Sequence, residues 1–443
     1  MAELRYTIGS RLPKQFKIIC SKAQKKSKLM RIEVICTGDE ILSGKTINTN
    51  FAHISRRLQE VGLPLTWETT VGDDKEELVR AFKLAGDRAD AVIVNGGLGP
   101  TQDDLSTPIA AEVAGVGLEL HEAWLANIEG FYAQRGRVMP PNNRKQAMLP
   151  VGAEFIDNPV GTACGFAITI GKGRFFFTPG VPRELRVMLE GQLIPRLTAM
   201  SGRESVVYLK RFHSFGQGES RVDSMLQGVE DLAPPGAVKL GFQAHYPQLE
   251  TKLMVEAPTM AEAQAIVAPV ADEVRKRIGN AILCEDDATL EGTILDELAK
   301  LGGSIAVAEV GTFGGVGARL AKADDGRGIF QRSAVCSRPA DMIHALDLAG
   351  ETEALAANAA TAVRAQTGTT HGLAVVIETS ADAAQPPFTM AVATADHVIT
   401  RTSALVGAAE RVRNGGTEMT LDLIRRLLEG KPTDESMDFE RAD

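Results

Sequence analysis

The chain has few cysteines for its length, and they form no recognisable pair. Five cysteines are scattered without a CxxC motif, at Cys20, Cys36, Cys164, Cys284 and Cys336. The seven histidines are scattered too, so no zinc-ligand constellation is visible. These absences exclude a disulfide framework and a zinc finger. They predict free, buried thiols in a protein of the reducing cytoplasm.

Long apolar runs and excess positive charge are also absent. No apolar stretch reaches membrane-spanning length, so no membrane partner is expected. The formal net charge of −9 makes nucleic acid an unlikely bulk partner. With 44% hydrophobic and 24% charged residues, the composition is that of an ordinary globular protein. A chain of 443 residues is too long to fold around a single hydrophobic core, so about two to four domains are expected.

The two ends of the sequence differ from its body. Residues 1–29 carry eight basic side chains against one acid, Glu3, and lack the apolar core of a secretory signal. We expect a disordered extension, with Met30 as an alternative start; a nucleic-acid arm or an organelle-targeting peptide is less favoured. Residues 431–443 are polar and acidic, and are predicted to form a disordered tail.

The most informative stretch runs from Val92 to Asp104. An apolar strand ends there in a glycine-rich turn, and a helix is expected from about Thr107. Glycines let backbone N–H groups approach an anion, and the helix N-terminus favours it. Asp103 and Asp104 would repel a phosphate unless a divalent cation lies between them. The stretch therefore predicts a metal-nucleotide or metal-pyrophosphate site, with a simply capped strand-to-helix turn as the alternative.

Two better-known phosphate motifs nearly fit and fail. The dinucleotide fingerprint needs a glycine where Gln102 stands. The stretch from Gly38 to Thr46 resembles a P-loop but has five residues before Gly44 instead of four. One extra residue changes which N–H groups converge, so both motifs are rejected.

Residues 30–200 alternate strands and helices. Strands are expected at 32–37, 65–71 and 91–95, and helices at 48–61, 75–85 and 107–116. This βαβ rhythm predicts an α/β fold with a doubly wound, mostly parallel sheet, whose ligands lie beyond the carboxyl ends of the strands. Residues 201–286 read as a small α+β module, and residues 287–430 as a second α/β domain.

Several polar turns could share one pocket at that sheet edge. Asp39 follows the first strand and could hold a divalent ion or activate water, although it could also cap a helix. Arg144 and Lys145 could neutralise phosphates, or form a solvated face. Cys164 is not expected to be a nucleophile, because no histidine is near it in the sequence. The predicted substrate-binding residues are Gly96, Gly97, Gly99, Thr101, Arg144, Lys145, Asn158, Gly161, Thr162 and Gly180.

Together these motifs resemble the CinA-like (competence/damage-inducible) family. The first block is similar to the molybdopterin-binding domain of the MogA/MoaB and MoeA types. The resembling motifs are residues 37–41, 95–104, 142–147, 158–166 and 178–184, and residues 212–220 resemble the family's KH-like module. The resemblance implies a metal-dependent pyrophosphatase acting on ADP-ribose-type nucleotides. It also implies an active-site role for Asp104, while Asp39 matches the acid of the first loop.

The third block departs from the family's nicotinamide-nucleotide amidase. That domain often carries Glu-Ser-Cys-Thr-Gly-Gly after a strand, whereas this chain has Val310 in place of the serine. Thr312 matches the motif's own threonine. The family's Tyr-Ser-Asn segment corresponds roughly to residues 331–333, without tyrosine, and its Thr-Gly-Ile-Ala-Gly-Pro loop corresponds to residues 379–383, without glycine. An alkyl side chain cannot act as a nucleophile, so we expect the amidase fold without its chemistry.

The sequence thus predicts divalent-metal-dependent hydrolysis of a nucleotide pyrophosphate in the first domain. Asp39, Asp103 and Asp104 would be the catalytic and metal-binding carboxylates, with Mg²⁺, Mn²⁺ or Co²⁺ as the cofactor. A molybdopterin-processing adenylyl transferase and a non-catalytic nucleotide-binding regulator are the alternatives. The expected partner is a small nucleotide. Family resemblance suggests a homodimer, and acids crowding the KH-like module make RNA binding improbable.

Overall fold

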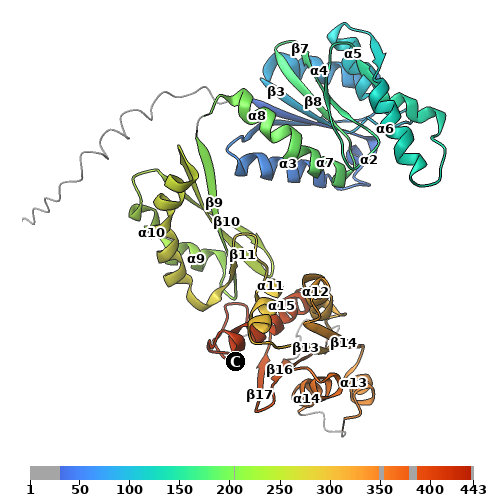
Figure 1. The fold of residues 1–443 in the computed structure, drawn as a ribbon. Coiled ribbons are helices and arrows are strands. Elements are labelled where there is room, and N and C mark those ends of the chain that lie inside the picture. The colour runs from blue at the N-terminus through green and yellow to red at the C-terminus, as the bar shows by residue number, and fades with distance from the viewer. Residues whose placement is uncertain (1–29, 204, 349–353, 379–386, 441–443) are drawn as a thin grey trace, which may run out of the picture. The chain divides into compact units, whose positions relative to one another are not determined.

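A computed structural model describes residues 30–203, 205–348, 354–378 and 387–440 (Figure 1). The expectations for residues 1–29 and for the loop at 379–383 lie outside this part. The chain forms two compact units that divide between Val206 and Val207, and each is described by itself. Within the described residues, no helix is long and apolar enough to cross a bilayer.

The first unit is built on a six-stranded sheet in the order β2-β1-β3-β8-β7-β6. The strands are β1 (Ile32–Thr37), β2 (Leu65–Val71), β3 (Ala91–Asn95), β6 (Glu154–Ile156), β7 (Gly165–Ile170) and β8 (Gly173–Thr178). Strands β2, β1, β3 and β8 run parallel, whereas β7 pairs antiparallel with both of its neighbours, β8 and β6. The predicted mostly parallel, doubly wound sheet is therefore confirmed, and all three predicted strands have the expected bounds.

Helices cover both faces of this sheet. One face packs against α3 (Thr49–Glu60), α7 (Pro182–Met188), the π-helical turn η2 (Leu189–Leu193) and α8 (Ile194–Ser201). The other packs against α4 (Lys75–Arg88), α5 (Ser106–Ala114) and α6 (Glu122–Ala133). Strands β1 and β3 are buried along their whole length, which explains their continuous apolar sequences. The short elements are α2 (Asp39–Leu42), η1 (Pro141–Ala147), β4 (Leu118–Leu120) and β5 (Met148–Pro150).

The second unit contains two sheets. Its first part has a four-stranded sheet in the order β10-β11-β9-β12. The strands are β9 (Val206–Phe215), β10 (Val238–His245), β11 (Gln248–Ala257) and β12 (Ile282–Glu285). Its helices are α9 (Glu219–Leu226), η3 (Val229–Leu232), α10 (Met260–Ile278) and η4 (Gly279–Ala281). This is the small α+β module expected from the sequence.

The remaining part of the second unit has a five-stranded sheet in the order β14-β13-β15-β16-β17. The strands are β13 (Ile305–Val310), β14 (Phe330–Cys336), β15 (His371–Val376), β16 (Phe388–Ala393) and β17 (Val398–Ser403). The helices are α11 (Leu290–Lys300), α12 (Gly315–Asp324), α13 (Pro339–Ala345), α14 (Leu355–Thr367) and α15 (Ala409–Leu428). Strands β14, β13 and β15 are parallel, so the predicted second α/β domain is present.

The prediction of a disordered tail is wrong for residues 431–440. Glu435 pairs with Arg426, Asp438 with Arg221 and Glu440 with Arg401. Met437 is buried against Gly216. Composition alone suggested disorder, but the acids of this segment find arginines that the fold places beside them. Residues 431–440 therefore tie the α+β module to the sheet that follows it.

Candidate functional site

A cavity of about 550 Å³ opens at the carboxyl ends of β1, β3 and β8. These ends are neighbours, because Cys36 pairs with Asn95 and Asn95 with Thr178 across the sheet. Strand order reverses between β1 and β3, and α/β sheets place their ligand crevice at such a point. The structure thus joins the turns after the first and third strands in one pocket, as predicted.

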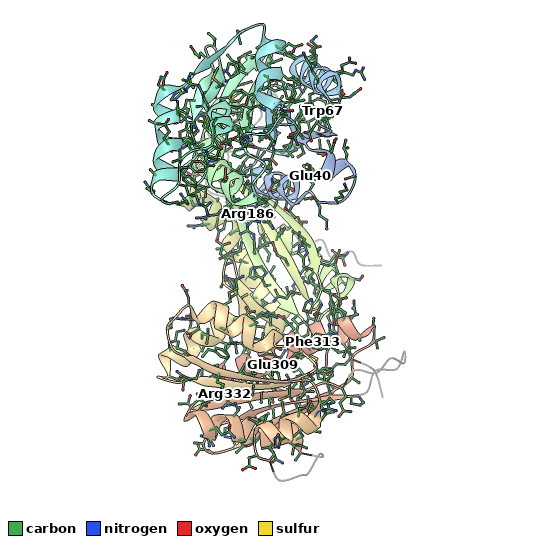
Figure 2. The ribbon with its side chains drawn as sticks, turned by 90° about the vertical axis from the view of Figure 1, so that its right-hand side faces the viewer. Glu40, Trp67, Arg186, Glu309, Phe313 and Arg332 are labelled. Atoms are coloured by element: carbon green, nitrogen blue, oxygen red, sulfur yellow. The ribbon has the colours of Figure 1, made fainter. Side chains whose placement is uncertain are left out.

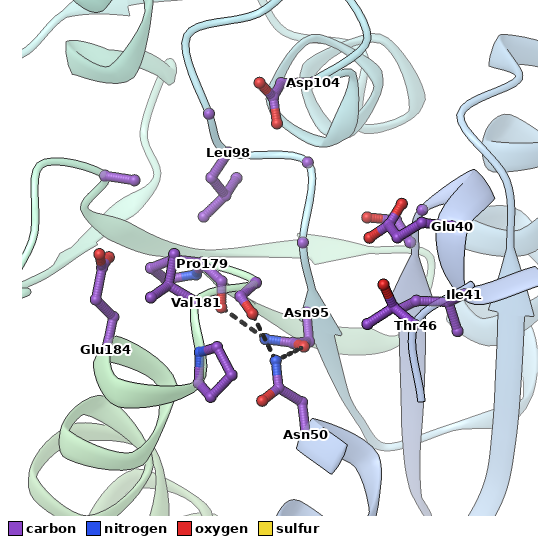
Figure 3. A pocket seen from close by; sticks show the side chains of 18 of the residues that line it. Glu40, Ile41, Thr46, Asn50, Asn95, Leu98, Asp104, Pro179, Val181 and Glu184 are labelled. Carbon is purple, nitrogen blue, oxygen red and sulfur yellow. Dashed lines mark hydrogen bonds between the residues drawn. The ribbon is translucent and has the colours of Figure 1, made fainter. Parts of the chain in front are cut away.

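Asn95 organises the floor of this cavity (Figure 3). Its amide nitrogen donates to the Pro179 carbonyl oxygen at 2.7 Å, and its amide oxygen accepts from Asn50 Nδ2 at 2.9 Å. Asn50 also donates to the carbonyl of Gly180 at 2.7 Å. These bonds fix the loops after β3 and β8 to the start of α3. Sequence reasoning missed Asn50, because an asparagine in a first helical turn has no distinctive pattern.

The glycine turn after β3 leaves backbone donors open to the cavity. The N–H of Gly96 is bonded to Thr178 O at 3.0 Å, and that of Ser106 to Gly97 O at 3.1 Å. The N–H groups of the residues between, Gly97, Leu98 and Gly99, make no hydrogen bond within the described residues, and all three residues line the cavity. Three consecutive N–H groups without an acceptor, in the turn that leads to α5, are available to an anion.

This turn could not be built without glycine. Gly97 has φ +68°, and a Cβ there would lie 2.3 Å from Ser106 Oγ. A Cβ at Gly99 would lie 2.3 Å from an oxygen of the Asp104 carboxylate. The predicted glycines Gly96, Gly97, Gly99 and Gly180 all line the cavity, as does Thr162.

Asp104 lines the cavity and also organises the turn. Its Oδ2 accepts from the Thr101 backbone N–H at 2.9 Å and from the Thr101 hydroxyl. Lys145 Nζ donates to the carbonyl of Thr101. Thr101 and Lys145, both predicted to bind substrate, therefore hold the turn instead of lining the cavity. Arg144 is exposed and lies outside the cavity lining.

Four carboxylates gather at one side of the cavity, and we call Asp39, Glu40, Asp73 and Asp103 the acidic edge. Glu40, Asp73 and Asp103 line the cavity, whereas Asp39 lines only an adjoining hollow. The backbone N–H of Asp39 donates to the Asp73 carboxylate at 3.1 Å, and the backbone N–H of Asp73 donates to the Asp39 carboxylate at 3.2 Å. Burial raises the pKa of Asp73, and the other three acids raise it further. Sequence reasoning missed Asp73, because it comes from the turn after β2.

The three predicted metal ligands are not assembled into one chelating group. Asp39 faces the hollow, and Asp104 is engaged with Thr101. Among the described residues, no group of three or more histidine, cysteine, aspartate or glutamate side chains could hold a metal ion by itself. A cation at this edge would therefore need oxygen ligands from a bound phosphate.

The opposite side of the cavity carries Glu184. Asn158 is buried behind it, and its Nδ2 donates to Glu184 Oε2 and to the Ala163 carbonyl, each at 2.8 Å. A Cβ at Gly161 would lie 2.2 Å from the Glu184 carboxylate. Asn158 and Gly161, which were predicted to bind substrate, thus position Glu184. Burial raises the pKa of Glu184.

Cys164 is buried close to this wall, and burial raises the pKa of its thiol to about 12. A thiol that stays protonated is a poor nucleophile. The structure therefore agrees with the expectation that Cys164 has no nucleophilic role.

The second unit has a comparable turn between β13 and α12, where the amidase motif was expected. Glu309 at the end of β13 is fully buried. It accepts hydrogen bonds from the backbone N–H groups of Val316 and Gly317 at 3.1 and 3.0 Å, and from the hydroxyls of Thr312 and Ser333 at 2.5 and 2.7 Å. The N-terminus of α12 is thereby occupied by a carboxylate of the chain itself.

No nucleophile stands at this turn within the described residues. Val310 is 1% exposed, and the Thr312 hydroxyl donates to Glu309. Phe313 adopts φ +56°, is 73% exposed and lies under the guanidinium of Arg413, 3.9 Å from the ring centroid. Figure 2 labels Glu309 and Phe313 in the second unit and Glu40 in the first.

Comparison with known families identifies two domains. Residues 33–199 match the family described as "Probable molybdopterin binding domain", and residues 210–283 match the "Damage-inducible protein CinA KH domain". The first match covers the β-strands and turns that build the cavity, and the second covers most of the α+β module.

Among solved structures, this chain is similar to the protein CinA of unknown function from Thermoplasma acidophilum, at 35% identity. The match covers 38% of this chain and 97% of that one, with a TM-score of 0.35. A molybdopterin biosynthesis enzyme MoaB from Thermus thermophilus is 18% identical, covering 39% and 98%, with a TM-score of 0.28.

Two proteins of Escherichia coli are each 41% identical over 295 residues, covering 67% of this chain and 72% of theirs. One is called a CinA-like protein and the other an NMN amidohydrolase-like protein. Together with the molybdopterin-binding and KH matches, this similarity shows that the chain belongs to the CinA-like family.

Proposed function

We propose that the first unit hydrolyses the pyrophosphate bond of an ADP-ribose-type nucleotide with the help of a divalent cation. The observation that carries this proposal is the pairing of open donors with the acidic edge. The unused N–H groups of Gly97, Leu98 and Gly99 suit phosphate oxygens, while Asp103, Glu40 and Asp73 line the same cavity. A phosphate and three carboxylates are compatible only when a cation lies between them.

The residues present fit a cation held jointly by protein and substrate. Mg²⁺ typically binds to one or two carboxylates plus phosphate oxygens, which suits a site without a complete protein cage. Asp103 and Glu40 would hold it, and Asp73 would stand behind them. When bound, the cation would supply Lewis acidity and a more acidic water.

The remaining chemistry belongs to the chain. The open N–H groups of the glycine turn would stabilise negative charge that develops on a phosphate oxygen. Asp104, held by Thr101, would keep these N–H groups in position. Asn50 and Asn95 would fix the loops against each other, so that substrate binding costs little reorganisation.

We further propose that the second unit lacks amidase activity. One relative is named as NMN amidohydrolase-like, but here Val310 is buried at the position of the nucleophilic serine. The Thr312 hydroxyl is engaged with Glu309, and Glu309 also fills the adjacent helix N-terminus. Among the described residues of this turn, no side chain is free for nucleophilic attack.

A molybdopterin-processing adenylyl transferase is a second candidate, favoured by the molybdopterin-binding family match. The same loops would then hold a pterin phosphate and a nucleotide. A nucleotide-binding regulator without turnover is a third, favoured by the absence of a preassembled metal site in the described residues.

The test is chromatographic detection of AMP from ADP-ribose with Mg²⁺, Mn²⁺ or Co²⁺, using wild type, Asp103→Asn and Asp104→Asn. The same samples are assayed for ammonia released from nicotinamide mononucleotide. Metal-dependent AMP that both variants reduce, without ammonia, supports the proposal. Absence of AMP with every metal contradicts the pyrophosphatase, and ammonia at an ordinary enzymatic rate contradicts the loss of amidase activity.

A further inference from the structure

The face of the first unit beside the cavity carries three arginines. Arg56 lies on α3, and Arg183 and Arg186 lie on α7; all three are exposed. None of them forms an ion pair with a carboxylate within the described residues. We call these three residues the arginine cluster. Helices α3 and α7 pack side by side on the same face of the sheet, and Figure 2 labels Arg186 there.

The arginine cluster continues directly from the cavity. Asn50, in the first turn of α3, lines the cavity. Arg56 follows it on the same helix by less than two turns. Arg183 lies between Pro182 and Glu184, which both line the cavity. A ligand that extends from the cavity over α3 and α7 would therefore approach the arginines.

The side chain of His53 lies among positively charged groups. It stands between Asn50 and Arg56 on α3, and its Nε2 is buried without a hydrogen-bond partner. Burial lowers the pKa of His53, and the charges of Arg186, Arg56 and Arg57 lower it further. Glu190, the acid that faces this group, is already bound by Arg57 at 2.6 and 3.0 Å. Glu184 is the acid that faces Arg183, and neither Glu190 nor Glu184 forms a salt bridge with the three arginines within the described residues.

The cluster and the acidic edge give the two sides of the site opposite charge. The acidic edge repels a phosphate unless a cation is present, whereas arginines attract phosphate without one and present donors in a fork that fits it. Arg56 Nη2 lies 3.5 Å from His53 Nδ1. Burial raises the pKa of Glu184, and the charge of Arg183 opposes this rise, but none of the three arginines forms a salt bridge within the described residues. In a chain with a net charge of −9, a bound anion would explain this grouping.

We propose that Arg56, Arg183 and Arg186 form a metal-independent anion site that binds a phosphate of the same nucleotide that enters the cavity. The inference rests on the proposed function only in placing a phosphorylated nucleotide in the cavity. It predicts that such a ligand binds in two stages: the arginines hold it without metal, and the cation then completes binding at the acidic edge.

The test measures binding by calorimetry in metal-free buffer containing EDTA. The ligands are ADP-ribose, inorganic phosphate, uncharged adenosine and a single-stranded RNA oligonucleotide. The proteins are wild type, the triple variant Arg56→Gln/Arg183→Gln/Arg186→Gln, and a control with the same charge change. That control replaces Lys83, Arg137 and Lys172, which are exposed, lie outside the cavity lining and form no ion pair within the described residues.

We expect the cluster variant to bind ADP-ribose at least about tenfold more weakly than wild type, since two or more charge-assisted hydrogen bonds are lost. The control variant should match wild type, and adenosine should not distinguish the three proteins. Loss of inorganic phosphate binding in the cluster variant alone would show that the arginines bind phosphate independently of the nucleoside, and supports the site.

Three results would overturn the inference. These are unchanged ADP-ribose affinity in the cluster variant, equal weakening in the control variant, or no metal-free binding by wild type. RNA binding that depends on the cluster while ADP-ribose binding does not would assign the surface to nucleic acid instead. The proposed hydrolysis fails separately, through the absence of metal-dependent AMP, so the two failures are distinguishable.

Discussion

The two units contain the same kind of strand-to-helix turn and use it in opposite ways. In the first, β3 leads through Gly96–Gly99 towards α5, and three N–H groups of the turn remain without partners in the described residues. In the second, β13 leads through Gly311–Gly315 into α12, and the Glu309 carboxylate accepts hydrogen bonds from two backbone N–H groups of the helix. The backbone design is shared, but one anion site is open and the other is filled from within.

The difference lies in where the carboxylates stand. Glu309 is placed on the strand itself and reaches the helix N-terminus of its own turn, where its charge is satisfied by four hydrogen bonds. Asp103 and Asp104 come after the glycines, so they border the open donors without occupying them. A filled turn contributes stability, whereas an open turn is available for a ligand.

The largest effect should follow from removing the Glu309 carboxylate from the turn between β13 and α12. Glu309→Ala leaves two buried N–H groups and two hydroxyls without their acceptor, and should lower the free energy of unfolding of the second unit by about 4 kcal/mol. Both tryptophans, Trp67 and Trp124, lie in the first unit. In urea, the circular dichroism transition of the second unit should therefore shift while the tryptophan fluorescence transition stays.

Glu297→Ala is the matched control for this prediction. Within the part of the chain that the structure describes, Glu297 pairs with the exposed Lys300 one helical turn away, and such pairs contribute less than about 1 kcal/mol. Equal effects of the two substitutions would show that Glu309 is not a structural occupant of the helix N-terminus.

Next in size is the effect of removing the acidic edge from the open turn. The double variant Asp103→Asn/Glu40→Gln should reduce metal-dependent AMP formation about 100-fold, equivalent to about 2.7 kcal/mol of transition-state stabilisation. The double variant Asp87→Asn/Glu119→Gln, with two exposed acids on α4 and β4, controls for the same change in charge. Wild-type rates in the Asp103→Asn/Glu40→Gln variant would remove the acidic edge from the mechanism and favour a site that only binds nucleotide.

A smaller effect should come from the glycine that keeps the first turn open. Gly97→Ala places a Cβ against Ser106 at a φ of +68°, so the turn must move. We expect a loss of about 1–2 kcal/mol in the tryptophan-reported stability and weaker ADP-ribose binding. Gly130→Ala, with no atom within 4 Å of the added Cβ in helix α6, should instead stabilise by about 0.5–1 kcal/mol. Destabilisation by both alanines would contradict the specific role of Gly97.

Much of the fold could be predicted because the local patterns of the first unit are strong. The apolar strands of 32–37 and 91–95 and the glycine turn after them specify a parallel sheet with a crevice. The residues that build the crevice from a distance could not be found in this way. Asn50 and Asp73 enter from other elements, and only the tertiary fold brings them to the turn after β3.

The same reason explains what local patterns could not specify. Thr101, Lys145, Asn158 and Gly161 lie beside the cavity lining and hold the turn of Asp104 or the carboxylate of Glu184, and their contact with substrate stays a prediction. The acidic segment 431–440 looked disordered because its arginine partners are distant in the sequence. Charge pairing over long sequence separations leaves no local pattern.

The smallest effect sharpens the comparison between two carboxylates, Glu309 and Glu184. Among the described residues, Glu184 accepts a hydrogen bond from one side chain, that of Asn158, and burial raises the pKa of Glu184. A carboxyl group with a raised pKa in the folded state contributes stability that is present below its unfolded pKa of about 4.3 and is lost as the pH rises through the folded pKa.

Glu184→Gln should therefore be slightly more stable than wild type at neutral pH, with the advantage disappearing on acidification. Urea midpoints of both proteins, followed by tryptophan fluorescence across this range, measure the difference. A stability advantage that grows on acidification would mean that the fold stabilises the Glu184 charge, contrary to the raised pKa.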